Sequence, residues 1–204
     1  VGEIEEKKSR FIASVEPVSS EDEAIAFFNR KKNEYWDARH ICTAFTIGSK
    51  HENKRCNDVG EQSGTAGRPM LDVLLREDIH NVAVVVTRYF GGTLLGTGGL
   101  VRAYQKSVLE GLANSVIITR QQGAKMTIRT DYTNLGKIQY LLAGAGITIL
   151  DTEYTDGVCI HTMVPEEQLT SLQNEITQGT NGQAVMELGD KTEYAILDGN
   201  VMIF

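Results

Sequence analysis

Residues 82–104, VAVVVTRYFGGTLLGTGGLVRAY, decide how the first half of the chain folds. The stretch opens with an apolar, mostly β-branched run at 82–86, which predicts a strand buried on both faces. A helical pattern opens at Leu100. The loop between the two contains glycine at Gly91, Gly92, Gly96, Gly98 and Gly99. Because glycine costs backbone entropy and adds no side chain to a core, we expect these residues to let the backbone turn sharply or approach another group closely.

This glycine-rich loop has two interpretations. A turn between a strand and a helix N-terminus presents unpaired N–H groups and the positive end of the helix dipole, so it can form an anion site. Alternatively, the glycines only permit tight packing of the strand against the helix. The spacing matches neither the Walker A pattern nor a full dinucleotide fingerprint. Arg88 and Arg102 flank the loop and favour the anion site, since a guanidinium can bind an oxyanion bidentately. Thr97 is expected to cap the helix before Leu100.

Three blocks of sequence carry a resemblance to a known family. They are Asp37-Ala38-Arg39-His40 followed by Cys42 and Ala44, then Gly60-Glu61 with SGTAGRPML at 63–71, and TRYFGGTLLGTGG at 87–99. On these blocks the amino-terminal half resembles the YigZ/IMPACT family. The family pattern Asp-Asp-Gly-Glu-Pro-Ser-Gly is altered here, because Val59 replaces the second Asp and Gln62 replaces the Pro. The missing carboxylate argues against a carboxylate-held metal.

The resemblance implies an α+β protein of two domains. Residues 1–120 are expected to form a β-α-β domain of ribosomal-protein type, like domain four of elongation factor G. Residues 121–204 are expected to form a ferredoxin-like domain with the order βαββαβ. Likeness to translation factors implies ribosome-linked or RNA-linked work. Eukaryotic relatives regulate the kinase response to amino-acid starvation through a protein partner.

Periodicity gives its own account of the element order. In the first half it predicts β, α, β, α, β, α, with a polar connection at 49–62. In the second half the best short hairpin signal is Asp156-Gly157. Around it the pattern predicts strands at 124–129, 147–154, 158–164, 184–188 and 194–197, helices at 134–142 and from Pro165 to about 178, and a short linker at 121–123. This order is the ferredoxin-like one.

Charge is distributed unevenly along the chain. Residues 1–118 hold 15 Lys and Arg against 16 Asp and Glu, whereas residues 119–204 hold 5 against 11, which together give the net charge of −7. The second half is therefore a poor nucleic-acid surface, and anion binding must fall to the first. No apolar run is long enough to cross a bilayer, so no membrane contact is expected. Three cysteines without metal spacing predict reduced thiols and a cytoplasmic protein.

Asp37, His40 and Glu61 are the residues on which an enzyme would depend. A histidine with nearby carboxylates can hold a metal or act as a general base, but no metal-ligand spacing accompanies His40. We therefore expect neither a metal nor another cofactor. Cys42 shares a strand face with His40, which permits a nucleophile pair, although a buried free cysteine is the commoner arrangement. Asp58 lies in a polar turn, where its plain role is turn formation.

The residues expected to bind a ligand gather in the glycine loop and the block before it. They are Asp58, Glu61, Thr65, Arg68, Arg88, Tyr89, Gly91, Gly92, Gly96, Thr97, Gly98 and Arg102. Arginines beside glycine turns and tyrosines favour phosphate binding with base stacking. We expect a non-catalytic, translation-linked protein that contacts RNA or the ribosome through its first domain. The alternatives are a hydrolase or transferase acting on a phosphorylated substrate, and a purely protein-binding module whose acidic second domain docks a partner.

Overall fold

The valine-rich run lies in the middle strand of a five-stranded sheet, sheet A, in the computed structural model of the protein, which describes residues 1–204. The strand is β5 (Val82–Tyr89), and all of its residues up to Arg88 are buried. The prediction of a strand buried on both faces is therefore confirmed. Sheet A has the order β1-β2-β5-β3-β4 with every neighbouring pair antiparallel, where the other strands are β1 (Gly2–Glu6), β2 (Ser9–Pro17), β3 (His40–Ile47) and β4 (Asn53–Asn57).

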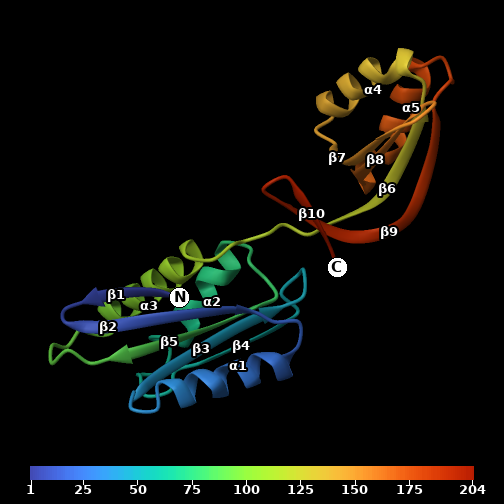
Figure 1. Ribbon diagram of the computed structural model, residues 1–204. Helices are drawn as coiled ribbons and strands as arrows, with labels where there is room; N and C mark the ends of the chain where they lie inside the picture. Colours follow the sequence, from blue (N-terminus) through green and yellow to red (C-terminus); the bar gives the residue numbers. More distant parts are fainter. The chain divides into compact units, whose positions relative to one another are not determined.

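Helices cover both faces of sheet A (Figure 1). On one face, α2 (Gly67–Arg76) and α3 (Thr97–Ala113) form a core with Val84 and Val86 of β5. On the other face, α1 (Glu21–Glu34) packs against Ala83 and Val85. Alternate residues of β5 thus serve the two cores, because successive strand side chains point to opposite faces.

The sequence periodicity does not predict two of the strands in this half, β1 and β4. The structure has the order ββαββαβα, in which β1 and β2 form a hairpin across Lys7 and Lys8 at φ 47° and 64°. This turn lacks the Asn-Gly or Asp-Gly sequence that usually announces such a hairpin. Strand β4 falls inside the predicted polar connection, because an exposed edge strand needs no apolar alternation. Helix α3 begins at Thr97, three residues before the predicted start at Leu100.

The chain divides into two compact units, Val1–Ile117 (unit 1) and Ile118–Phe204 (unit 2). Unit 2 contains sheet B, with the order β10-β9-β6-β8-β7 and antiparallel neighbours. Its elements are β6 (Gln121–Thr130), α4 (Tyr132–Gly144), β7 (Thr148–Tyr154), β8 (Val158–Pro165), the short 3₁₀ helix η1 (Glu166–Gln168), α5 (Leu169–Gly179), β9 (Val185–Leu197) and β10 (Asn200–Ile203). Without β10 this is the predicted ferredoxin-like order.

The α+β class and the two-domain organisation are therefore confirmed. Two details of unit 2 differ. Residues 121–123, predicted as a linker, begin β6, and the two predicted terminal strands are one long strand, β9.

One face of sheet B is apolar and lies under α4 and α5 (Figure 1). Strand β8 contributes Val158 and Ile160 to that core, so Cys159 and His161 lie on the opposite face. None of the helices in the structure is both long and apolar enough to cross a membrane.

Candidate functional site

The three family-like blocks meet at one end of sheet A. The first residue of β3, His40, pairs in register with Arg88 near the end of β5. Glu61, from the loop before α2, contacts both side chains. The start of α3 lies against the same loop, since the Oγ1 of Thr97 is 3.5 Å from the Oε1 of Gln62. The fold therefore gathers residues that are about 60 positions apart in the sequence.

At the centre of this end is a buried polar group, here called the Glu61 cluster, made of His40, Cys42, Glu61, Arg88 and Tyr104. The Oε1 of Glu61 accepts from the Nη1 of Arg88 at 2.7 Å and from the hydroxyl of Tyr104 at 2.9 Å. The side chains of Glu61 and Arg88 are each only 5% exposed. The Nδ1 of His40 is 3.3 Å from the same oxygen but lacks hydrogen-bond geometry, so we assign it no bond.

The guanidinium of Arg88 is committed to neighbours inside unit 1. Besides Glu61, its Nη2 donates to the Oγ of Ser9 at 3.3 Å. Its carbon Cζ lies 5.4 Å from the ring centre of Phe11 and 5.6 Å from that of Phe90. The sequence predicts that Arg88 binds an external oxyanion. In the structure its charge is instead balanced by the buried carboxylate of Glu61.

Burial also sets the protonation of the cluster. It raises the pKa of Cys42 to about 12 and raises the pKa of Tyr104 well above its usual value. The Cys42 thiol can donate to the Tyr104 hydroxyl at 3.6 Å or to the carbonyl of Val59 at 3.7 Å. At neutral pH the thiol is therefore protonated. This argues against a Cys42–His40 nucleophile pair and favours the buried free cysteine.

Asp58 organises the loop that delivers Glu61. Its Oδ2 accepts from the N–H of Gly64 at 2.9 Å, and its Oδ1 accepts from the N–H groups of Ala66 at 3.0 Å and Gly67 at 2.6 Å. The last two amides begin α2, so a carboxylate from eight residues upstream closes that helix N-terminus. Thr65 completes the loop by donating to the carbonyl of Gln62 at 2.6 Å.

The N-terminus of α3 is open by contrast. Its N-cap is Gly96, at φ 73°, and not Thr97, which is the first helical residue; the predicted capping role of Thr97 is therefore wrong. A glycine cap has no side chain to accept a bond, and no acidic residue follows in the first turn. Gly96 and Gly98 are both exposed. The first amides of α3 therefore face outward without a side-chain acceptor.

Gly91 and Gly92 behave differently from each other. The N–H of Gly91 donates to the Oγ of Ser9 at 3.2 Å, and a Cβ on this residue would be 2.0 Å from the carbonyl carbon of Lys8. Only glycine permits that approach of two backbone segments. Gly92 is exposed at φ 85°, and a Cβ on it would meet no atom within 4 Å. The loop thus packs closely at its start, as the second interpretation expects, and has exposed backbone further along.

Three cations line a pocket that runs along the first three turns of α3. A pocket of about 240 Å³ is lined by Lys7, Arg102 and Lys106 together with Glu6, Leu95, Gly99 and Ala103. Lys7, Arg102 and Lys106 take part in none of the salt bridges of the structure. We call these three residues and Gly96 to Gly99 the α3 rim. The pocket includes none of Asp37, His40 and Glu61.

The remaining predicted residues lie around this end of the sheet or on α2. Asp37 accepts from the hydroxyl of Tyr89 at 2.8 Å, and Arg68 pairs with Asp72 on α2 at 2.7 Å. Sequence reasoning missed Lys7 and Lys106. Their signals were the hairpin turn for Lys7 and, for Lys106, its position four residues after Arg102, which places both on one helix face.

Known families and proteins resemble this chain over most of its length. Residues 7–112 match the Impact N-terminal domain, and residues 128–183 match a domain of unknown function, DUF1949. The chain is 41% identical to IMPACT family member YvyE of Bacillus subtilis, over 93% of this chain and 88% of that protein. It is 32% identical to IMPACT family member YigZ of Escherichia coli, over 86% and 87%. A solved structure described as a hypothetical protein is 31% identical, with a TM-score of 0.56 over 90% of both chains.

Proposed function

The chain belongs to the IMPACT family, and from that premise we propose that unit 1 binds single-stranded RNA through the α3 rim, in a non-catalytic, translation-linked role in the cytoplasm. The observation that carries the proposal is the set of three unpaired cations along the first three turns of a 17-residue helix whose N-terminus has no side-chain cap. Phosphate groups are the anions that such an arrangement suits best.

The electrostatics of the rim favour an anion because its three cations share the pocket with only one carboxylate, that of Glu6, and none of them forms an ion pair with it. A helix N-terminus carries a partial positive charge, and cations beside it are unfavourable by themselves. The Nη1 of Arg102 would lie 3.5 Å from a Cβ on Gly98, so its guanidinium is folded back over the first turn of α3. A bound phosphate would accept hydrogen bonds from the first amides of α3 and from the guanidinium of Arg102 at the same time. This relieves the repulsion and supplies charge-assisted hydrogen bonds.

Exposed aromatic rings at the same end of sheet A as the rim can supply base stacking. Phe90 follows β5 directly and is 51% exposed, with the guanidinium of Arg88 behind its ring. Trp36, the only tryptophan of the chain, is 83% exposed and precedes Asp37, which is bonded to Tyr89 at this same sheet end. Aromatic rings beside a cationic groove are typical of proteins that bind single-stranded nucleic acid.

The charges of the two units favour an RNA contact in unit 1 over one in unit 2. Unit 1 has 15 basic and 16 acidic residues, whereas unit 2 has 5 and 11. An RNA backbone would be repelled by unit 2, which suits a protein partner better. Arg88 and Glu61 enter this proposal as residues that hold the sheet end and Phe90 in place, and not as phosphate ligands.

Binding of labelled single-stranded RNA over a range of salt concentrations tests the proposal. The double variant Arg102→Ala, Lys106→Ala should bind more weakly. The slope of log K against log salt is negative, and each lost phosphate contact reduces its magnitude by about 0.7. The magnitude should therefore decrease by about 1.4 in the double variant. The matched control, Lys50→Ala with Lys54→Ala, removes the same charge at the opposite end of sheet A, where β3 ends and β4 begins.

Trp36 offers a second readout in the same experiment, since quenching of its fluorescence reports a base stacked nearby. Cosedimentation with ribosomes tests the translation setting. Equal affinity and equal salt slope in the two double variants would reject the α3 rim as the RNA surface. RNA binding without cosedimentation would support the α3 rim as an RNA surface and would reject the ribosome as its target.

A further inference from the structure

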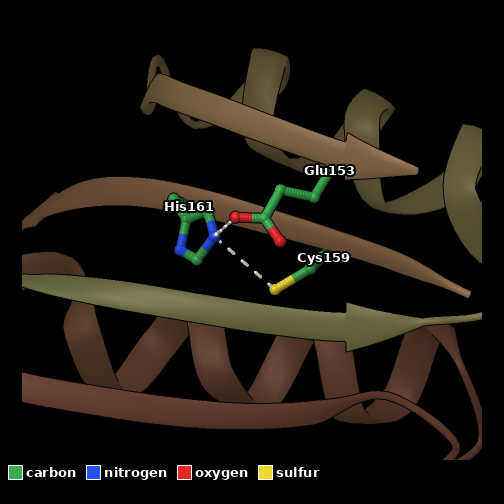
Figure 2. A group of neighbouring side chains, drawn as sticks. All are labelled: Glu153, Cys159 and His161. Atoms are coloured by element: carbon green, nitrogen blue, oxygen red, sulfur yellow. Dashed lines mark hydrogen bonds and ion pairs between the residues drawn. The ribbon is translucent and has the colours of Figure 1, made fainter. Parts of the chain in front are cut away.

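Unit 2 holds a cluster of three potential metal ligands on the face of sheet B opposite α4 and α5. They are Glu153 on β7 and Cys159 and His161 on β8 (Figure 2). Glu153 pairs in register with Cys159, and His161 follows two residues later on the same strand face. The hairpin between β7 and β8 thereby brings a carboxylate, a thiol and an imidazole together.

We propose that Glu153, Cys159 and His161 form a zinc-binding site. The Nε2 of His161 lies 3.3 Å from the Oε1 of Glu153 and 3.7 Å from the Sγ of Cys159, and all three donor atoms lie within 4.8 Å of one another. Ligands at ordinary Zn–N, Zn–O and Zn–S distances on a tetrahedron are separated by about 3.4 to 3.6 Å. The two donor pairs that include His161 therefore already lie close to the spacing that one zinc ion requires, and the third pair lies within 4.8 Å.

The donor types select zinc among the common divalent ions. Calcium and magnesium prefer oxygen ligands alone, whereas sulfur with imidazole and carboxylate suits zinc. A thiolate and a carboxylate balance the charge of the ion, and the imidazole binds as a neutral ligand. Three protein ligands leave the fourth position to water. The surplus of acidic residues in unit 2 also favours a cation.

A third strand orients the histidine. The Nδ1 of His161 lies 3.1 Å from the Oγ1 of Thr127, its register partner on β6. When Nδ1–H donates to this hydroxyl, the lone pair of Nε2 faces Glu153 and Cys159. Metal-binding histidines usually donate their second ring nitrogen to such a partner, which fixes the tautomer and the ring orientation. Thr127 thus acts as a positioning residue.

The site differs from the expectation that the chain binds no metal. That expectation rested on the absence of paired ligand motifs such as C-x-x-C. On a strand, however, the two residues of a Cys-x-His sequence point to the same face and can bind one ion together. The third ligand comes from across the Asp156-Gly157 hairpin, and its register was not readable from spacing alone.

Cobalt(II) substitution tests the site, because thiolate-bound cobalt has a charge-transfer band in the near ultraviolet that other ligands do not give. The full chain is treated with a chelator, titrated with Co²⁺ and then with Zn²⁺. We expect one cobalt per chain, displaced by zinc. Cys159→Ser should abolish the band, while Cys56→Ser, which removes an exposed thiol in unit 1, should leave it unchanged.

A second variant separates the site from simple loss of a cysteine. Thr127→Val keeps all three ligands but removes the partner of His161, and it should weaken zinc binding about 10- to 100-fold while the cobalt band persists at saturation. Circular dichroism confirms that each variant is folded. The proposal is overturned if the wild type gives no band, if Cys159→Ser retains it, or if Thr127→Val binds zinc as tightly as the wild type.

Discussion

The Glu61 cluster and the α3 rim lie at the same end of sheet A, and each contains an arginine from the glycine-loop region, yet they differ in almost every physical respect. In the cluster, Arg88 is 5% exposed and paired with Glu61. In the rim, Arg102 is exposed and unpaired at an uncapped helix end. The difference shows that an arginine beside a glycine-rich loop can be enclosed in the fold or left unpaired at the surface.

The backbone element decides which of these two environments each arginine has. Arg88 is on the inner face of a central strand, two residues after Val86, so its side chain enters the core and requires a counter-charge. Arg102 is on the outer side of α3, so water or a ligand can reach it. The same contrast separates the two helix ends, because Asp58 closes α2 while nothing closes α3.

Removing the charge of Glu61 should give the largest effect. Glu61→Gln leaves the buried guanidinium of Arg88 without a counter-charge, and loss of one partner of a buried ion pair costs about 3 to 5 kcal/mol. Urea unfolding followed by circular dichroism measures this loss. The double variant Glu61→Gln, Arg88→Met should recover part of it, because no unpaired charge remains. Full stability of Glu61→Gln together with weaker RNA binding would break the distinction between cluster and rim.

Alkaline pH should weaken the cluster by a moderate amount. The pKa of Cys42 is about 12 in the folded chain, against about 8.5 for an ordinary cysteine, so the folded state keeps a proton that the unfolded state has lost. The contribution is fully present below about pH 8.5 and is lost as pH rises towards 12, at about 1.4 kcal/mol per pH unit. The raised pKa of Tyr104 acts in the same direction at higher pH.

The control for this pH effect is Cys42→Ala, which should lower stability at pH 7 but show a shallower decline between pH 9 and 10. Chemical unfolding at each pH provides the comparison. An identical pH dependence in the two proteins would mean that Cys42 titrates normally and is not held in the cluster.

Sequence reasoning reached the β5 strand, the α+β class and the ferredoxin-like order because each depends on local periodicity or on long family-like blocks. The sequence does not predict the partner of Arg88, because Glu61 is 27 residues away and is brought to Arg88 by the loop that Asp58 holds between β4 and α2. It assigned Thr97 as a cap, since a hydroxyl normally takes that position, whereas Gly96 has it. Lys7 joins the rim only through a hairpin that its sequence does not announce.

A carboxylate placed in the first turn of α3 should give the smallest effect on stability, and its sign should be opposite to the others. Gly98 is exposed and helical, without a positive φ, and a Cβ there would meet only the Nη1 of Arg102, at 3.5 Å. Gly98→Asp should stabilise unit 1 by about 0.3 to 1 kcal/mol through the helix dipole. The same charge should compete with phosphate and reduce the magnitude of the slope of log K against log salt for RNA binding by about 0.7.

Gly98→Ala separates charge from helix propensity in this last comparison. Alanine is the better helix former by up to about 1 kcal/mol, so it should also stabilise the helix, but it adds no anion. RNA affinity should therefore fall in Gly98→Asp and stay unchanged in Gly98→Ala, as measured by the same salt titration. If both variants bound RNA equally well, the open end of α3 would be only a consequence of loop packing, and the rim would resemble the Glu61 cluster in having a purely structural role.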